Sequence, residues 1–266
     1  MALYFYLLSS LPDFHLPIRT EQLDESIDTI LRNVTPEDQR IVHILLERRD
    51  HINLFSLLCQ KNLKINSPAL RHSHGLLPDQ LQSLFTEEMH LPDHLITWRQ
   101  WLKHEGEQES LTLWVTKLRS LYLEHCSQIC PPPLLKVLQT EDELLRQVAH
   151  YYQTGTSLNS PQAITEEPWL TKAKAPSELL EKRLPGLTDL WNALENGQLY
   201  QQDVFFETVI ENQAFLNAPP YSSMEVFALV IRWTHAYRRA ELRQEPERVH
   251  LQQLLQELLP QHYSQS

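Results

Sequence analysis

Glycine is scarce in this sequence of 266 residues, which contains only five glycines, well below the roughly 7% of an average protein. The two closest, Gly186 and Gly197, are still 11 residues apart. A phosphate-binding loop, a dinucleotide-binding turn or a nucleophile elbow needs at least two glycines within a few residues. The sequence therefore excludes the common glycine signatures of nucleotide-binding proteins and serine hydrolases.

Cysteine is equally scarce, because three residues are too few and too odd in number for a disulfide framework. Cys126 and Cys130 would share one face of a helix, but a zinc site needs two further ligands and the chain has no second cysteine pair. We therefore expect reduced thiols, no metal and no cofactor. The 13 histidines contain no H-E-x-x-H arrangement, and we expect them, including His90 and His94, at the surface.

Long apolar runs and excess positive charge are also missing. No stretch approaches the roughly 18 apolar residues of a membrane-spanning helix, and the apolar start of the chain lacks the basic segment of a signal peptide, since the first basic residue is Arg19. Lys and Arg number 23 against 34 Asp and Glu, which gives a formal net charge of −11. We therefore expect no membrane span, no nucleic-acid binding, and a location in the cytoplasm or on the cytoplasmic side of a membrane.

Apolar residues do recur at helical spacing along most of the chain. Thr35 is a typical N-cap residue, and Pro36 suits the first position of a helix. The first ten residues are too short for periodicity to distinguish a strand from a buried helix. The predicted helices cover residues 21–33, 36–61, 79–88, 93–105, 109–129, 133–153, 176–196, 200–217, 223–243 and 246–258.

Strand and hairpin patterns hardly occur. Asn196-Gly197 follows a helical pattern and is typical of a helix C-terminus rather than of a hairpin turn. The sequence therefore predicts an all-α fold, a bundle or a stack of helical hairpins joined by short loops. Residues 154–168 form the best candidate linker between an N-terminal helical region, residues 1–153, and a C-terminal one, residues 169–266. One continuous domain is the alternative.

No group of side chains indicates catalysis, and we expect acidic runs such as Glu141, Asp142 and Glu143 at the solvated surface. Basic residues concentrate on the predicted helix 223–243, where they either cover apolar surface with their stems or contact an acidic partner.

Two further groups of residues are structural candidates. Asp50 and Asn53 are poor choices inside a helix because their side chains compete for backbone hydrogen bonds. We therefore expect them to fix a helix–helix junction through side-chain hydrogen bonds. The aromatic amino terminus, including Tyr4 and Tyr6, is expected to anchor the core.

Three segments of the sequence resemble segments of a known protein family. Residues 4–12 read Y-F-Y-L-L-S-S-L-P, residues 49–54 read R-D-H-I-N-L, and residues 221–228 read Y-S-S-M-E-V-F-A. They resemble the Y-Y-Y-L-V-A-S-L-P start, the D-x-x-N-L segment and the F-S-x-E-x-x-x-A-Y helix of a family of uncharacterised bacterial proteins. Members of that family are typically encoded among the subunits of bacterial V-type ATPases. The D-x-x-N-L segment also looks like helices in the rotor-cap subunit of V/A-type ATPases, which has a counterpart in the eukaryotic enzymes.

The resemblance implies an all-α, funnel-like subunit that caps the membrane rotor ring, receives the central shaft and transmits torque without binding nucleotide. It implies a non-catalytic subunit at the cytoplasmic side of the inner membrane, whose partners are the rotor ring and the central-stalk subunits. On this hypothesis Arg232, Arg238 and Arg239 face a partner.

Two other functions remain open. One is an assembly or adaptor protein for the same ATPase that is not a permanent subunit. The other is an unrecognised hydrolase or metal enzyme that uses some of the histidines. The chain departs from the rotor-cap subunit in being shorter than that subunit usually is and in having one clear D-x-x-N-L segment where the rotor-cap subunit has several.

Overall fold

The structure is a computed structural model, and it describes residues 4–14, 19–63, 92–105, 111–154, 175–197 and 199–244. Within these ranges every regular element is a helix, which confirms the predicted all-α fold. The helices are α1 (Phe5–Ser10), α2 (Thr20–Asn33), α3 (Pro36–Leu63), α5 (Asp93–His104), α6 (Leu111–Ile129), α7 (Pro132–Thr154), α8 (Glu178–Arg183), α9 (Leu187–Glu195), α10 (Leu199–Leu216) and α11 (Ser223–Gln244).

Most predicted helices correspond to one observed helix. The start of α3 follows the predicted pattern, because the Thr35 hydroxyl accepts a hydrogen bond from the Asp38 backbone N–H at 3.2 Å. The undecided N-terminal segment is the short helix α1. The helices predicted at residues 79–88 and 246–258 lie outside the described residues, as does most of the candidate linker.

The single helix predicted at 176–196 is wrong, because the chain turns a corner between α8 and α9. Pro185 has no backbone N–H to continue a helix, and Gly186 has a φ of +97°. The carboxylate of Glu181 holds this corner by accepting hydrogen bonds from the backbone N–H groups of Gly186 at 2.7 Å and Thr188 at 2.8 Å. The chain therefore forms two short helices here.

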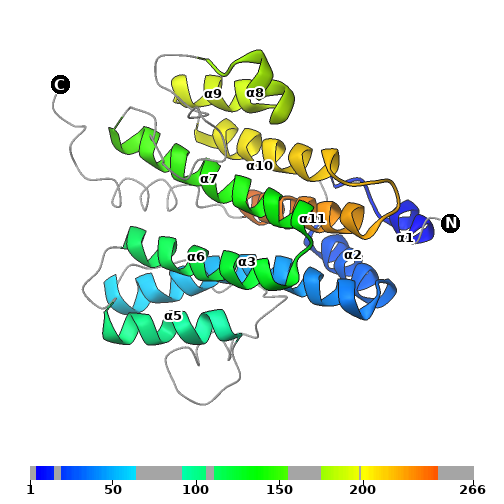
Figure 1. Cartoon of the computed structure of the whole chain (residues 1–266), viewed down its shortest axis with the longest axis horizontal. Helices are drawn as coiled ribbons and strands as arrows, with labels where there is room; N and C mark the ends of the chain where they lie inside the picture. Colours follow the sequence, from blue (N-terminus) through cyan, green and yellow to red (C-terminus); the bar gives the residue numbers. More distant parts are fainter. Residues whose placement is uncertain are drawn as a thin grey trace.

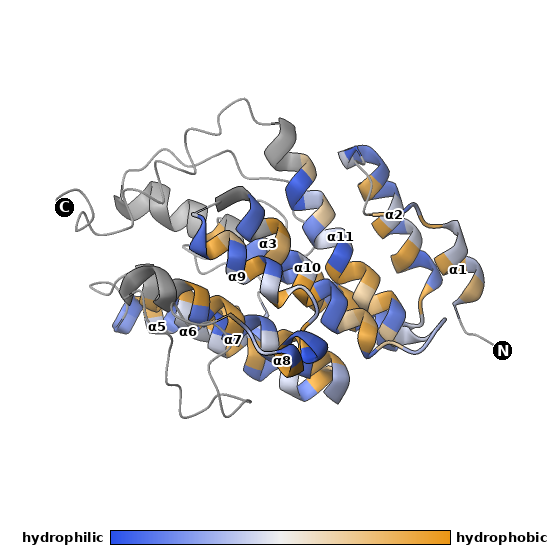
Figure 2. Ribbon diagram, turned by 90° about the horizontal axis from the view of Figure 1, so that it is seen from above, coloured by the Kyte–Doolittle hydropathy of each residue, from blue (hydrophilic) through white to orange (hydrophobic). Residues whose placement is uncertain are grey.

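Most of the helices lie along one long axis (Figure 1). The hairpins α6–α7 and α10–α11 are antiparallel, whereas α3 and α11 run in the same direction, with Asp38 and Ser223 in contact where the two helices begin. The long helix α3 packs against both α6 and α11, while α10 lies between α9, α11 and α7. The pairs α5–α6, α6–α7 and α10–α11 are also direct contacts, as expected for hairpins joined by short connections. Figure 2 shows hydrophobic residues gathered where α10 and α11 lie against their neighbours.

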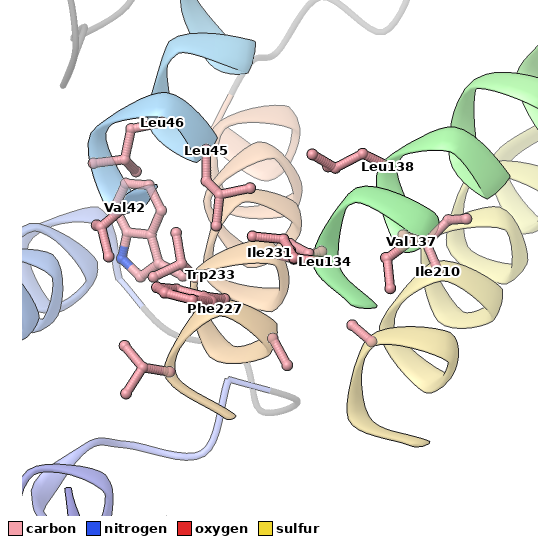
Figure 3. Close-up of a cluster of buried hydrophobic side chains, with 14 of the residues drawn as sticks. Val42, Leu45, Leu46, Leu134, Val137, Leu138, Ile210, Phe227, Ile231 and Trp233 are labelled. Carbon is pink, nitrogen blue, oxygen red and sulfur yellow. The ribbon is translucent and has the colours of Figure 1, made fainter. Parts of the chain in front are cut away.

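The core draws on helices from both sides of residues 154–168. Side chains of α3, α7, α10 and α11 meet in it (Figure 3). The Trp233 ring is fully buried, and its indole N–H donates to the Leu23 carbonyl oxygen of α2 at 2.7 Å. The labelled core residues are Val42, Leu45, Leu46, Leu134, Val137, Leu138, Ile210, Phe227, Ile231 and Trp233. Among the helices described, none combines the length and the apolar content needed to cross a bilayer.

Candidate functional site

The N-terminal junction is a set of hydrogen bonds that ties α1 to α3 and α11. The Tyr4 hydroxyl donates to Asp38 Oδ2 at 2.5 Å and accepts from the Thr35 backbone N–H at 3.1 Å. The Ser223 hydroxyl donates to the same oxygen of Asp38 at 2.8 Å. Burial and the hydrogen bond to Asp38 raise the pKa of the Tyr4 hydroxyl. The junction is therefore a set of polar contacts in which Tyr4 and Asp38 are buried and Thr35 and Ser223 are half-buried.

Only one of the two tyrosines expected in the core lies there. Tyr4 is buried, whereas the Tyr6 side chain is 87% exposed. The expectation is wrong for Tyr6 because the segment is a helix, in which residues two apart point in different directions.

The turn between α10 and α11 closes against α1. The Tyr4 backbone N–H donates to the Tyr221 carbonyl oxygen at 3.4 Å, and the rings of Phe5 and Tyr221 meet edge to face with their centres 5.0 Å apart. Tyr221 has a φ of +57°, the one positive value among the described residues other than glycine. Its backbone N–H donates to the carboxylate of Glu225. The turn is therefore fixed by a backbone hydrogen bond from Tyr4 at the start of α1 and by the carboxylate of Glu225 in the first turn of α11.

The second polar site is an ion-pair network between α10 and α11. Glu211 is buried on α10. One carboxylate oxygen, Oε2, accepts from Arg232 Nε at 2.9 Å, and the other, Oε1, lies 3.0 Å from His235 Nδ1. Burial alone would raise the pKa of Glu211, but the hydrogen bond to His235 and the charges of His235, Arg239 and Arg232 outweigh it, so the pKa lies below its usual value. The carboxylate is therefore held in its charged form.

Glu207 makes the other half of this network one turn earlier. It is buried on α10 and accepts hydrogen bonds from Arg238 Nη1 at 3.2 Å and from Arg239 Nη1 at 2.6 Å. Arg239 also lies 3.6 Å from Glu211 and so joins the two halves. The network consists of Glu207, Glu211, Arg232, His235, Arg238 and Arg239.

Arg232, Arg238 and Arg239, which were expected to face a partner, thus form ion pairs with Glu207 and Glu211 of the same chain. Sequence reasoning found these basic residues but missed Glu207 and Glu211, the acidic residues that hold them. A signal existed, because two carboxylates four residues apart lie on one face of a helix that is otherwise rich in apolar residues. Such a pair would be buried without charge compensation unless a basic helix packed against it.

A third polar site is a histidine cluster between α3, α5 and α6. It consists of Glu47, His51, His94, Tyr122 and His125. Nε2 of His94 lies 3.7 Å from Glu47 Oε2, the His94 and His125 rings stack with centres 4.9 Å apart, and the His51 ring meets the Tyr122 ring edge to face at 5.0 Å. The surface expectation is wrong for His51, His94 and also His235 of α11, which are buried. His90 lies outside the described residues.

Burial controls the protonation of this cluster. It lowers the pKa of His94 to about 4, with His125 as a second cause, and lowers that of His51 well below its usual value. Burial and the nearby charge of Asp50 raise the pKa of Glu47 to about 7. The buried histidines are therefore neutral at pH 7, while Glu47 is close to half protonated.

The acidic run of α7 is another correction, because it does not lie at a solvated surface. Glu141 and Glu143 are buried. Glu141 pairs with Arg48 of α3, and Asp142 lies 2.8 Å from Arg119 of α6. These ion pairs show that Glu141 and Asp142, in the middle of α7, face the neighbouring helices α3 and α6.

The predicted junction of Asp50 and Asn53 is described only in part. Asp50 is fully buried on α3, at the edge of the histidine cluster. The side chain of Asn53 lies outside the described residues. Their joint role in fixing a helix contact stays a prediction.

The cysteines give no sign of a metal site in the described part of the chain. Cys126 and Cys130 are buried, free thiols on consecutive turns, and the contact between them and burial raise the pKa of Cys126. No group of three or more potential ligands suited to a metal ion occurs among the described residues.

Each of these sites joins neighbouring helices, because Asp38, Glu207 and Glu211 each bind donors from another helix. Comparisons with models of protein families, with curated proteins and with solved structures found no significant match.

Proposed function

We propose that this chain is a non-catalytic helical subunit of a bacterial V-type ATPase, which couples the membrane rotor ring to the central stalk in ATP-driven ion transport. The proposal starts from the resemblance carried by residues 4–12, 49–54 and 221–228. It is supported by the contact between the first and third of these segments, made by Tyr4 with Tyr221 and, through Asp38, with Ser223. This contact carries the proposal, because it gives two separate sequence likenesses one structural reason.

The helix contacts also suit a subunit that transmits force. A torque-bearing protein needs helices that do not slide along one another. Buried charges with several partners favour one register, because sliding would leave a carboxylate such as Glu207 or Glu211 without compensation. On this proposal the protein acts at the cytoplasmic side of the inner membrane, binds the ring and the central-stalk subunits, and has neither a nucleic-acid partner nor a cofactor.

Affinity purification of the tagged full-length protein from detergent-solubilised membranes tests this function. The co-purifying chains are identified and quantified by mass spectrometry. We expect the head, shaft and ring subunits of the ATPase at a fixed ratio to the tagged chain. Recovery at a low ratio that varies with growth conditions would instead favour an assembly or adaptor protein. Recovery of no ATPase subunit would contradict the proposal.

A further inference from the structure

Helix α5 lies at one edge of the helix array, beside α6 and α3 and apart from the α10–α11 hairpin (Figure 1). It packs against α6, where the indole N–H of Trp98 donates to the Trp114 carbonyl oxygen at 3.2 Å. Leu95 and Trp98 are buried, but among the described residues the main hydrophobic core includes no side chain of α5. Helix α5 can therefore move without breaking the contacts of that core.

The contact between α5 and α3 is polar and lacks hydrogen bonds. His94 of α5 is buried, its Nε2 lies 3.7 Å from Glu47 Oε2, and its ring centre lies 5.7 Å from that of His51. A distance of 3.7 Å is too long for a hydrogen bond. Within the described part of the chain, both ring nitrogens of His94, Nε2 of His51 and Oε2 of Glu47 are buried without a hydrogen-bond partner. Burial of such atoms costs free energy, because water would supply the missing hydrogen bonds.

The other polar contacts between helices differ in this respect. Asp38, Glu207 and Glu211 each accept hydrogen bonds from a neighbouring helix, and none of their oxygens is buried without a partner. Separating those helices would break hydrogen bonds, whereas separating α5 from α3 would allow hydrogen bonds to form with water. Opening should therefore cost least at the contact between α5 and α3.

We propose that α5 is a movable cover, which separates from α3 in the folded protein and exposes the side chains of Glu47, His51 and His94 to water. The main core and the α10–α11 hairpin stay closed, because local opening needs less free energy than global unfolding. In the open form, Glu47 and His51 lie one turn apart on the same face of α3. The cover thus hides a carboxylate and an imidazole that a ligand or partner could bind only in the open form. The inference concerns α5 alone and does not depend on the proposed function.

Labelling of histidines in the full-length protein with diethyl pyrocarbonate tests the cover. The reagent acylates a neutral imidazole nitrogen that solvent reaches, and both ring nitrogens of His94 are buried in the closed form. His104, in the last turn of α5, is exposed and gives the rate of an unprotected histidine. The protein is labelled at neutral pH over a series of urea concentrations below the unfolding transition, and fragmentation of peptides in a mass spectrometer assigns each label. Circular dichroism measures global unfolding over the same series.

We expect His94 to be labelled more slowly than His104 but at a rate that hardly changes with urea, because a local opening exposes little new surface. A rate that rises with urea as steeply as global unfolding would overturn the inference, since His94 would then be exposed only in the unfolded chain. Absence of labelling at His94 below the transition would overturn it too.

A matched pair of substitutions on α3 tests the cause of the opening. His51→Leu removes an unpaired buried nitrogen from the contact, so it should slow the labelling of His94 by about tenfold. His43→Leu is the control, because His43 is exposed on the same helix and should leave the rate unchanged. Equal labelling of His94 in the two variants would contradict the explanation by unpaired polar atoms. If His51→Leu fails to fold, the urea series on the wild type decides alone.

Discussion

Glu207 of α10 and Arg239 of α11 meet at 2.6 Å with the carboxylate almost completely buried. The pair is 32 residues apart in sequence and lies in the interface of the α10–α11 hairpin. A buried carboxylate is costly without compensation, so the basic residues of α11 are what allow α10 to carry Glu207 at all. The stability of the hairpin therefore depends on the alignment of α10 along α11 that brings Glu207 to Arg239.

Replacing Glu207 with Gln should destabilise the protein by about 2 kcal/mol. The substitution removes the carboxylate that accepts from Arg238 and Arg239, so Arg239 keeps its longer contact of 3.6 Å with Glu211. Removing one partner of a fully buried pair costs about 3–5 kcal/mol. We expect less here because the arginine side chains keep some contact with water. Urea unfolding gives the free energy of unfolding.

The exposed pair Arg32–Asp28 supplies the control for this measurement. Both of its side chains are mostly exposed, so Arg32→Gln should change the free energy of unfolding by less than about 0.5 kcal/mol. A loss from Glu207→Gln no larger than that from Arg32→Gln would show that the α10–α11 network contributes nothing measurable.

The N-terminal junction predicts a difference between two tyrosines. Tyr4→Phe removes the hydroxyl that bonds to Asp38 and to the Thr35 N–H, and should cost about 1–2 kcal/mol of stability. Tyr6→Phe should be neutral, because Tyr6 is exposed. Thermal unfolding of the two variants side by side tests this, and equal midpoints would mean that the Tyr4 hydroxyl does not stabilise the junction.

Helices were the part of the fold that sequence could predict. The apolar period and the Thr35-Pro36 start specify α3, since local chemistry decides both. The break between α8 and α9 also had a local signal in Pro185 and Gly186, although the surrounding apolar pattern hides it.

The candidate sites were harder to predict because their geometry comes from tertiary packing. Arg239 was recognised as part of a basic helix, but its partner Glu207 lies on another helix, and no local pattern shows which faces meet. The same holds for His94, whose burial depends on α3 and α6 covering it. The residue types of a site are visible in the sequence, whereas packing decides which of them are brought together.

The corner at Gly186 predicts unequal costs for two glycine substitutions. At Gly186, with a φ of +97°, a Cβ would lie 3.5 Å from Val209 Cγ2, which is ordinary contact, so backbone strain alone sets the cost of Gly186→Ala. We expect about 1–2 kcal/mol. Gly197→Ala should cost less, because its φ of +64° lies within the small left-handed region that Ala enters at some cost, whereas +97° lies outside that region. Chemical denaturation distinguishes them, and equal losses would contradict the explanation.

Glu47 predicts a pH-dependent stability. Its pKa in the folded protein is about 7, above the ordinary value of 4.5, because burial and the charge of Asp50 disfavour the carboxylate. Between pH 4.5 and 7 the folded state therefore binds more protons than the unfolded state, so the contribution of Glu47 to stability falls as the pH rises and stays low above pH 7. The Gln side chain in the Glu47→Gln variant cannot ionise, so the stability of this variant should not show this decrease with rising pH.

The stability of Glu47→Gln relative to wild type should therefore increase from pH 5 to pH 8, by about 2–3 kcal/mol. His94→Gln should show the opposite pH dependence. Burial lowers the pKa of His94 from 6.5 to about 4, so the wild type loses stability as the pH falls from 6.5 to 4. The stability of His94→Gln relative to wild type should therefore increase as the pH falls. Urea unfolding of all three proteins from about pH 4 to pH 8 measures both effects. Relative stabilities that stay constant with pH would show that neither side chain titrates as its burial in the histidine cluster requires.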